Sequence, residues 1–310
     1  MNSIKIIANG KYLPKNKIDN KYLTKELGIE EEYIYKRTGI QTRFYSEKEE
    51  IEDIAIKSVE NLIQNNPNIN IKETQMIVVA TTSTNMLMPG ISYKVQEKLG
   101  IDKCICLDIL AGCAGYINAF DLARNYIAMK KVDQALIIGV DILSKYINKQ
   151  DIGTTIILGD GAGATLIKKT EEPKMYQSII ESNGLKGDIL TNNKNEKIKM
   201  KGKEVYKYAV TETIKNIEEL LKVSKIDLDK VKYIVPHQSN LKIIKSIANK
   251  LNIDIYKMYI NIKNVGNTFC GSIPIALTEM FEKGLLQEGD KIILIGYGGG
   301  LNTGSILIEI

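Results

Sequence analysis

The sequence contains a single histidine, His237, and no tryptophan. A zinc site built from several histidines is therefore excluded, and any mechanism that needs an imidazole has one candidate. Only three arginines are present, Arg37, Arg43 and Arg124, although lysine is abundant and the formal net charge is +5. Because arginine makes most specific contacts to bases and phosphates, we expect no nucleic-acid partner and a surface solvated by lysine.

Cysteine is scarce as well. Cys104, Cys106, Cys113 and Cys270 are too few in 310 residues for a disulfide framework, and none of their spacings is a Cys-x-x-Cys metal or redox motif. No apolar run approaches the ~18 residues that cross a bilayer, and the N-terminal stretch does not read as a signal peptide. We therefore expect reduced thiols, no bound metal, no membrane association and a cytoplasmic protein.

Short apolar, β-branched runs alternate with helical patterns along the chain, which predicts a layered α/β fold with strands buried on both faces. The sequence predicts strands at 77–80, 104–110, 135–140, 155–158, 233–235 and 291–295. It predicts helices at 54–63, 93–99, 117–129, 205–223, 241–251 and 273–281.

The two halves of the chain resemble each other at one offset. A shift of 157 residues aligns the run at Met76 with that at Tyr233, Cys113 with Cys270, and the Ile-Ile-Gly ending at Gly139 with a later Leu-Ile-Gly. We interpret this as an internal duplication with halves 1–170 and 171–310, joined in the polar stretch 168–174, with a longer loop at 85–90 in the first half. Chance similarity of strand-turn-helix units is the alternative.

Cys113 lies in Leu-Ala-Gly-Cys-Ala-Gly-Tyr, between a predicted strand and a predicted helix. Small neighbours at such a turn let a ligand approach closely, and a helix N-terminus favours thiolate over thiol. We therefore predict that Cys113 is a nucleophile. Cys104 and Cys106 alternate along a strand, which indicates structural cysteines on one face.

His237 follows a predicted strand in Val-Pro-His-Gln-Ser-Asn, at the edge where open sheets place ligands. The duplication brings its loop to the side that carries Cys113. Asn267, in Gly-Asn-Thr-Phe-Cys-Gly-Ser-Ile-Pro, is the second-half counterpart of the Cys113 turn, although turn or cap chemistry alone would explain it.

Two glycine-rich segments have different interpretations. The segment 298–300 brings bare backbone N–H groups to a strand end, which suits an oxyanion or a plain turn. The segment 159–163 hints at a phosphate loop, but Gly-Lys-Ser/Thr is missing, so close packing of strands and helices is the better interpretation.

Together these motifs resemble the β-ketoacyl-acyl carrier protein synthase III family of the thiolase-like superfamily. The resemblance covers residues 6–310 and includes Arg-Thr-Gly-Ile at 37–40, Val-Ala-Thr-Thr-Ser at 79–83 and Gly-Asp-Gly-Ala-Gly at 159–163. It implies a thiolase-like fold of five α-β-α-β-α layers with two similar halves, a homodimer, and a catalytic triad of Cys113, His237 and Asn267. Elongating ketosynthases need two histidines, and thiolases use a second cysteine where Asn267 stands. Plant-type polyketide synthases share the triad but are longer.

The resemblance implies a decarboxylative condensation that initiates fatty acid biosynthesis. Cys113 attacks an acyl thioester, with the oxyanion held by the backbone N–H groups of Cys113 and Gly299. His237 and Asn267 then donate hydrogen bonds to the carbonyl of malonyl-acyl carrier protein as it loses CO2. Coenzyme A and phosphopantetheine enter as parts of substrates, and no cofactor is expected.

The resemblance also implies binding surfaces. Acyl carrier protein docks on the segment of Gln238, Ser239, Asn240, Leu241 and Lys242, where Lys242 faces acidic helices and Lys250 extends the basic patch. Positions for coenzyme A or pantetheine are Tyr33, Arg37, Ile152, Gly153 and Asn240. The family's tryptophan is Tyr33 here and its arginine is Ile152, which removes much of the adenine clamp. The acyl donor is therefore bound weakly as coenzyme A or arrives on a carrier protein.

The resemblance assigns Met88 to a contact that bounds the acyl pocket across the dimer. Three rival functions stay open: a ketosynthase III-like acyltransferase of specialised metabolism, which forms an ester or amide or uses a non-standard donor; a cysteine hydrolase; and a non-catalytic scaffold. The hydrolase is disfavoured because the Cys-Gly-Ser-Cys-Trp signature is absent.

Overall fold

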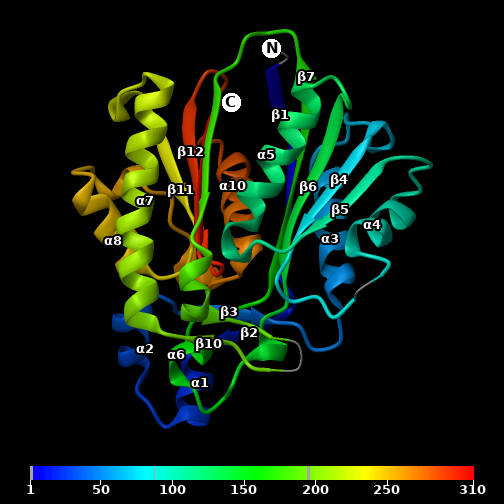
Figure 1. Cartoon of the computed structure of the whole chain (residues 1–310). Helices are drawn as coiled ribbons and strands as arrows, with labels where there is room; N and C mark the ends of the chain where they lie inside the picture. The colour runs from blue at the N-terminus through cyan, green and yellow to red at the C-terminus, as the bar shows by residue number, and fades with distance from the viewer. Residues whose placement is uncertain (1–2, 87, 194–195) are drawn as a thin grey trace.

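Two β-sheets lie side by side with helices between them in the computed structural model, which describes residues 3–86, 88–193 and 196–310 (Figure 1). The first sheet has the order β1-β7-β6-β4-β5 and the second the order β11-β12-β13-β8. The first contains β1 (Ser3–Tyr12), β4 (Met76–Ala80), β5 (Ile105–Ile109), β6 (Gln134–Asp141) and β7 (Gly161–Thr170). The second contains β8 (Tyr176–Ser182), β11 (Tyr233–Pro236), β12 (Lys291–Gly298) and β13 (Asn302–Glu309).

Helices form the other three layers of the molecule. Between the sheets lie α5 (Gly115–Ala128) and α10 (Ser272–Glu282). The outer face of the first sheet is covered by α3 (Ile51–Asn65) and α4 (Ile91–Leu99), and that of the second by α7 (Gly202–Ser224) and α8 (Leu241–Lys250). The predicted α-β-α-β-α architecture is therefore confirmed.

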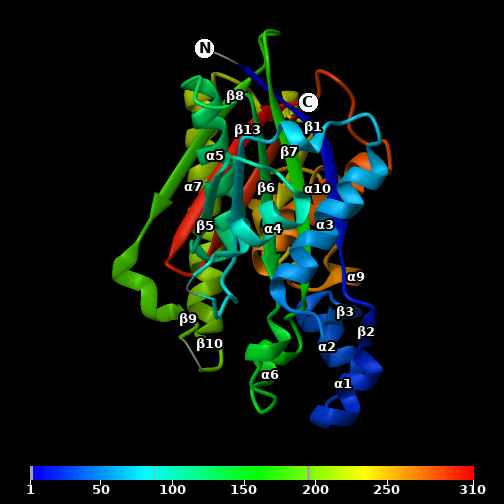
Figure 2. The ribbon, with the colours of Figure 1, turned by 90° about the vertical axis from the view of Figure 1, so that its right-hand side faces the viewer.

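Smaller elements cluster at one end of the molecule (Figure 2). They include the hairpin β2 (Asn16–Asp19) and β3 (Thr42–Tyr45), and the short helices α1 (Asn20–Leu27), α2 (Glu31–Thr38), α6 (Ile152–Thr155) and α9 (Ile262–Val265). The strand pair β9 (Leu190–Thr191) and β10 (Lys199–Met200) lies in the insertion before α7. Among the described residues, no helix is both long and apolar enough to cross a bilayer.

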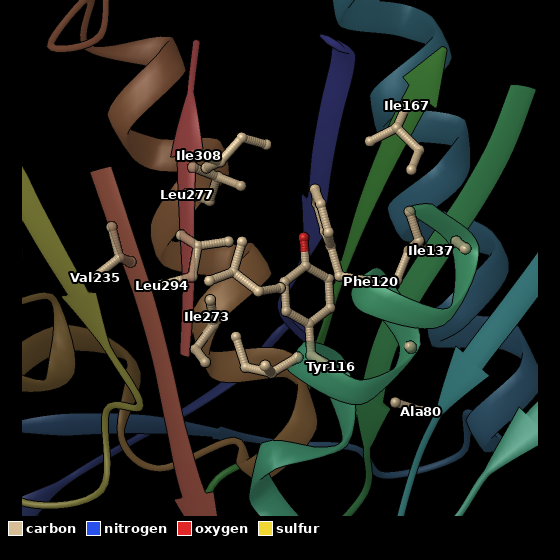
Figure 3. Close-up of a cluster of buried hydrophobic side chains, with 14 of the residues drawn as sticks. Ala80, Tyr116, Phe120, Ile137, Ile167, Val235, Ile273, Leu277, Leu294 and Ile308 are labelled. Carbon is tan, nitrogen blue, oxygen red and sulfur yellow. The ribbon is translucent and has the colours of Figure 1, made fainter. Parts of the chain in front are cut away.

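The central core joins the two halves of the chain. Tyr116 and Phe120 of α5 project between the sheets, and their buried neighbours come from both sheets and from α10 (Figure 3). The Tyr116 hydroxyl lies 2.8 Å from the Thr165 Oγ1, so the one polar atom of this ring has a partner. This core contains residues from both halves of the chain, so the two halves do not pack as separate units. The boundary between halves 1–170 and 171–310 stays a prediction.

The structure confirms the internal duplication. Strand β11, the 3-10 turn η7 (Phe269–Gly271), α10 and β12 each begin 157 residues after β4, η2 (Gly112–Ala114), α5 and β6. The sheet order β1-β7-β6-β4 repeats as β8-β13-β12-β11. The loop after β4 is longer than the loop after β11, as expected. The turns that carry Cys113 and Asn267 therefore begin equivalent helices of the central layer.

Residues 155–163 differ from the sequence prediction in one segment and agree with it in the next. The strand predicted at 155–158 is wrong: Thr155 ends α6, because Asp151 caps this helix by accepting from the Gly153 N–H at 2.9 Å. The packing role of 159–163 is confirmed, since a Cβ atom on Gly163 would lie 2.7 Å from the Ile275 nitrogen of α10.

Candidate active site

Cys113 lies in the turn η2, where glycines let three chain segments meet. Gly112 has φ of 55°, and a Cβ atom there would lie 2.2 Å from the Gly299 oxygen. A Cβ atom on Gly298 would lie 2.6 Å from the Cys113 nitrogen and 3.0 Å from its sulfur. The thiol is consequently held against the end of β12, and Cys113 is only 3% exposed.

The surroundings of the Cys113 thiol raise its pKa. Burial raises the pKa of Cys113 strongly and the Asp141 carboxylate raises it further, whereas backbone hydrogen bonds from Gly299 and from Cys113 itself lower it. Desolvation therefore opposes the thiolate that the helix N-terminus would favour, and the expectation of a thiolate stays a prediction. The same two backbone groups face the sulfur, where the predicted oxyanion donors belong.

His237 immediately follows β11 and is 1% exposed. Its backbone N–H donates to the Ile295 oxygen at 2.8 Å, and its Nδ1 lies 2.6 Å from the Ser272 Oγ of α10. Its ring meets that of Tyr297 edge to face, with 5.3 Å between centroids. Burial lowers the pKa of His237 to about 3, so the imidazole is neutral at physiological pH.

Tyr297 packs against His237 near the end of β12. Burial raises the pKa of the Tyr297 phenol. Its hydroxyl lies 2.7 Å from the Ser239 Oγ. The imidazole of His237 and the ring of Tyr297 are therefore neighbours near the end of β12.

Hydrogen bonds of its backbone and of its side-chain oxygen fix the position of Asn267. Its N–H donates to the Ile157 oxygen at 3.0 Å, and its carbonyl accepts from the Gly159 N–H at 2.9 Å. The amide Oδ1 accepts from the Phe269 N–H at 3.0 Å, and Phe269 has φ of 43°, which is strained for an aromatic residue. This arrangement leaves the Nδ2–H donors of Asn267 for other partners.

A cavity of about 380 Å³ opens at Cys113. Its apolar wall includes Met86, Leu110, Tyr146, Leu190, Ile198 and Phe269, and Thr82, Asn85 and Asn192 add polar groups. Cys113 and Gly299 line it, whereas His237 and Asn267 do not. The sulfur and one expected oxyanion donor thus face the cavity, and the other two predicted catalytic residues are buried.

The predicted coenzyme A positions lie around the junction of α2 and α8. The Arg37 guanidinium lies 5.9 Å from the centroid of the exposed Tyr33 ring, and the Asn240 Nδ2 donates to the Arg37 oxygen at 3.2 Å. Ile152 packs near Ile34 in an apolar cluster and offers no charge. Gly153 donates its N–H to Asp151. None of these positions lines the cavity.

The predicted carrier-docking segment is only partly available at the surface. Gln238 is fully buried: its Nε2 donates to the Pro236 and Tyr259 oxygens at 2.8 and 3.0 Å, and its Oε1 accepts from two backbone N–H groups. It braces the loop and cannot contact a partner, which corrects the prediction for this residue. Lys242 is exposed in the first turn of α8, and Lys250 is exposed in its last.

The other two members of this segment have structural contacts. Ser239 is half-buried against Tyr297, and Leu241 packs against Gly39, where a Cβ atom would lie 2.3 Å from that of Leu241. Met88 is 86% exposed and does not line the cavity within this chain, whereas Met86 does. A role for Met88 across a dimer stays a prediction.

Two buried polar residues near the predicted catalytic residues were not identified from the sequence. Ser272 stands in the motif that contains Asn267, but nothing in the sequence indicates that it meets His237. Asp141 follows the apolar run 135–140. An acidic residue at the end of a buried strand is the sequence signal that could have identified it. In the described parts of the chain, no cluster of three or more histidine, cysteine or acidic side chains could hold a metal ion.

Comparisons with known proteins agree with this geometry. The family model described as 3-Oxoacyl-[acyl-carrier-protein (ACP)] synthase III matches residues 107–184, and the model of its C-terminal part matches residues 221–310. The chain is 41% identical to the β-ketoacyl-[acyl-carrier-protein] synthase III of Clostridium botulinum, covering 99% of both chains, and 37% identical to that of Clostridium acetobutylicum, covering 100% and 99%.

A solved structure of 3-oxoacyl-[acyl-carrier-protein] synthase III from Aquifex aeolicus superposes with a TM-score of 0.96 at 33% identity, covering 99% of this chain and 100% of that one. Both the sequence relatives and this solved structure match the chain over nearly its whole length, and all of them are condensing enzymes by name. The alternatives of a cysteine hydrolase and a non-catalytic scaffold are therefore not supported. The chain belongs to the β-ketoacyl-[acyl-carrier-protein] synthase III family, and it has the thiolase-like fold of that family.

Proposed function

We propose that this enzyme condenses an acyl thioester with malonyl-acyl carrier protein through an acyl-Cys113 intermediate, the initiating step of fatty acid biosynthesis. The observation that carries the proposal is the thiol of Cys113 at an apolar cavity, with the backbone groups of Gly299 and Cys113 facing the sulfur. This arrangement suits a covalent acyl intermediate that is protected from water.

In the first half-reaction, the sulfur of Cys113 attacks the thioester carbonyl and the carrier thiol leaves. The proton of Cys113 ends on the leaving sulfur, which balances the exchange of one thiol for another. Because burial raises the pKa of the Cys113 thiol, the thiol loses its proton as the sulfur attacks. The N–H groups of Cys113 and Gly299 stabilise the tetrahedral oxyanion.

In the second half-reaction, malonyl thioester loses CO2 and its enolate carbon attacks the acyl carbonyl. The Cys113 sulfur leaves and takes up one proton, which regenerates the thiol. A neutral imidazole and an amide donate hydrogen bonds to the developing enolate without supplying a charge, which suits His237 and Asn267. Donation from the His237 Nε2 requires that the Ser272 hydroxyl donates to Nδ1.

The acyl and malonyl carriers act as substrates in this scheme, and no resident cofactor takes part. Lys242 and Lys250, with Lys245 between them, give α8 an exposed basic side that suits the acidic surface of acyl carrier protein. Strand β5 is an outer strand of the first sheet, and Leu110 beyond it is 73% exposed. A homodimer that pairs this edge with that of a second copy would cover both.

One observation favours a second candidate function, an acyltransferase of specialised metabolism with a non-standard acyl donor. Ile152 packs into an apolar cluster and the exposed ring at position 33 is tyrosine, so the coenzyme A mouth lacks two groups of the family's clamp. A panel of acyl donors distinguishes the two functions. Preference for acetyl or short branched acyl donors with malonyl-acyl carrier protein supports the primary role.

Intact-mass spectrometry tests the chemistry directly. After mixing with acyl thioesters, the wild-type enzyme should gain one acyl mass, and Cys113→Ala should gain none. His237→Ala and Asn267→Ala should still acquire the acyl group but should not release CO2 from malonyl-acyl carrier protein. An acyl adduct that survives in Cys113→Ala would refute the proposal.

A further inference from the structure

The second buried cysteine of the active-site region, Cys270, contacts the peptide that carries the nucleophile. Cys270 stands in the turn η7 at the position equivalent to Cys113 and is 1% exposed. Its Sγ donates to the Gly112 oxygen at 3.0 Å, and a backbone hydrogen bond from Gly115 also reaches this sulfur. The Cys270 thiol therefore contacts the backbone of Gly112 and Gly115, on either side of Cys113.

The Gly112 oxygen and the Cys113 N–H belong to the same peptide group. In a trans peptide these two groups point in opposite directions within one plane. A donor that holds the Gly112 oxygen consequently sets the direction of the Cys113 N–H, and it also polarises that group. Such support matters here because Gly112 has φ of 55° and no side chain to restrain its rotation.

Asp141 holds the backbone of Cys270 in place. Its Oδ2 accepts from the Cys270 N–H at 3.0 Å, and its Oδ1 accepts from the Thr82 N–H at 2.7 Å and the Ser83 Oγ at 2.8 Å. The carboxylate is wholly buried at the end of β6. Burial, the charge of Asp141 and a hydrogen bond with the Asp141 side chain raise the pKa of the Cys270 thiol, which keeps its proton on the sulfur.

We infer that Cys270, anchored by Asp141, is a positioning residue that aims the Cys113 N–H at the thioester oxyanion. This inference rests on the proposed function, because it assigns support to the oxyanion donor of that reaction. It predicts that loss of the Cys270 thiol slows reactions that form an oxyanion and spares reactions of the Cys113 sulfur that do not.

Two reactions of the same sulfur provide the test. Acyl transfer from an acyl thioester passes through a tetrahedral oxyanion, whereas alkylation by iodoacetamide displaces iodide at a saturated carbon and forms none. Single-turnover acylation and alkylation of the Cys113 peptide are followed by mass spectrometry in the wild type, Cys270→Ala and Cys270→Ser. Cys106→Ala is the matched control, because it removes a buried thiol whose partners are Cys104 and, on α4, Ser92 and Gln96.

We expect Cys270→Ala to acylate roughly tenfold more slowly, the loss typical of one supporting hydrogen bond, with alkylation within about twofold of the wild type. Cys270→Ser, whose hydroxyl can donate to the Gly112 oxygen, should recover to within about threefold, and Cys106→Ala should match the wild type. Equal losses in both reactions, or wild-type acylation by Cys270→Ala, would overturn the inference. Acylation of Cys113→Ala would instead overturn the proposed function.

Discussion

The Nδ1 atom of His237 lies 2.6 Å from the Oγ atom of Ser272, across the interface between β11 and the central helix α10. The imidazole is therefore oriented by a neutral hydroxyl rather than by a carboxylate. A carboxylate partner would favour the imidazolium, whereas a hydroxyl in a buried site leaves the ring neutral. This pairing suits a residue that donates a hydrogen bond to a substrate carbonyl.

Ser272→Ala should slow decarboxylation of malonyl-acyl carrier protein by roughly tenfold, because the imidazole loses the hydrogen bond that sets its tautomer and orientation. Acylation of Cys113 should change little. Release of labelled CO2 measures the first effect and intact mass the second. Thr278→Val, which alters a buried hydroxyl further along the same helix, is the control and should retain both activities.

The buried imidazole predicts a specific dependence of stability on pH. Its pKa is about 3 in the folded protein, below the ordinary value of 6.5, so the unfolded chain binds more protons between these limits. His237 therefore makes folding less favourable as pH falls from about 6.5 towards 3, by up to ~1.4 kcal/mol per pH unit. Urea unfolding of the wild type and His237→Gln across this range isolates the contribution, since this is the only histidine. Parallel pH profiles for the two proteins would contradict the prediction.

Gly298→Ala should inactivate the enzyme without removing any catalytic group. The added Cβ atom would lie 2.6 Å from the Cys113 nitrogen and 2.7 Å from its Cβ, so the nucleophile must move. Because a displacement of about 1 Å can cost 10²-fold, we expect at least that loss in acylation rate. Gly202→Ala, where nothing lies within 4 Å of the new atom, should acylate normally. Normal acylation by Gly298→Ala would show that the turn can adjust.

Substitutions at positions 33 and 152, which we proposed to lie at the coenzyme A mouth, should change carrier preference. Tyr33→Trp combined with Ile152→Arg supplies an aromatic face and a cation, so KM for acyl-coenzyme A should fall about tenfold with kcat unchanged. KM for an acyl donor on carrier protein should stay constant. Ile152→Leu, which preserves the apolar cluster, is the control. An equal change for both donors would place these residues outside the coenzyme A site.

The sequence predicted most of the buried parallel strands, because apolar β-branched runs such as Met76–Ala80 have few other interpretations. It did not predict β1 or β7, whose glycines and lysines interrupt the pattern, and it mistook the Asp-capped turn at Thr155 for a strand. Cys113 and Asn267 were identifiable because glycines and small residues surround them.

Properties that depend on packing across the fold could not be predicted. Arg43 is fully buried and donates to the Asn20 side chain and the Ile156 oxygen, although its sequence context resembles that of a surface arginine. The raised pKa of the Cys113 thiol follows from burial that only the folded chain provides. The burial of Gln238 likewise depends on the chain near Tyr259, which contacts it only after folding.

The repeat divides the chemistry between two stretches of chain that share one interior. The sulfur comes from the first stretch, whereas the imidazole and the amide come from the second, and α5 and α10 lie together in the middle layer. If the polypeptide were severed between β7 and β8, neither fragment would be competent by itself. Turnover would depend on reassociation and would vary with fragment concentration, as for an enzyme whose active site is shared by two subunits.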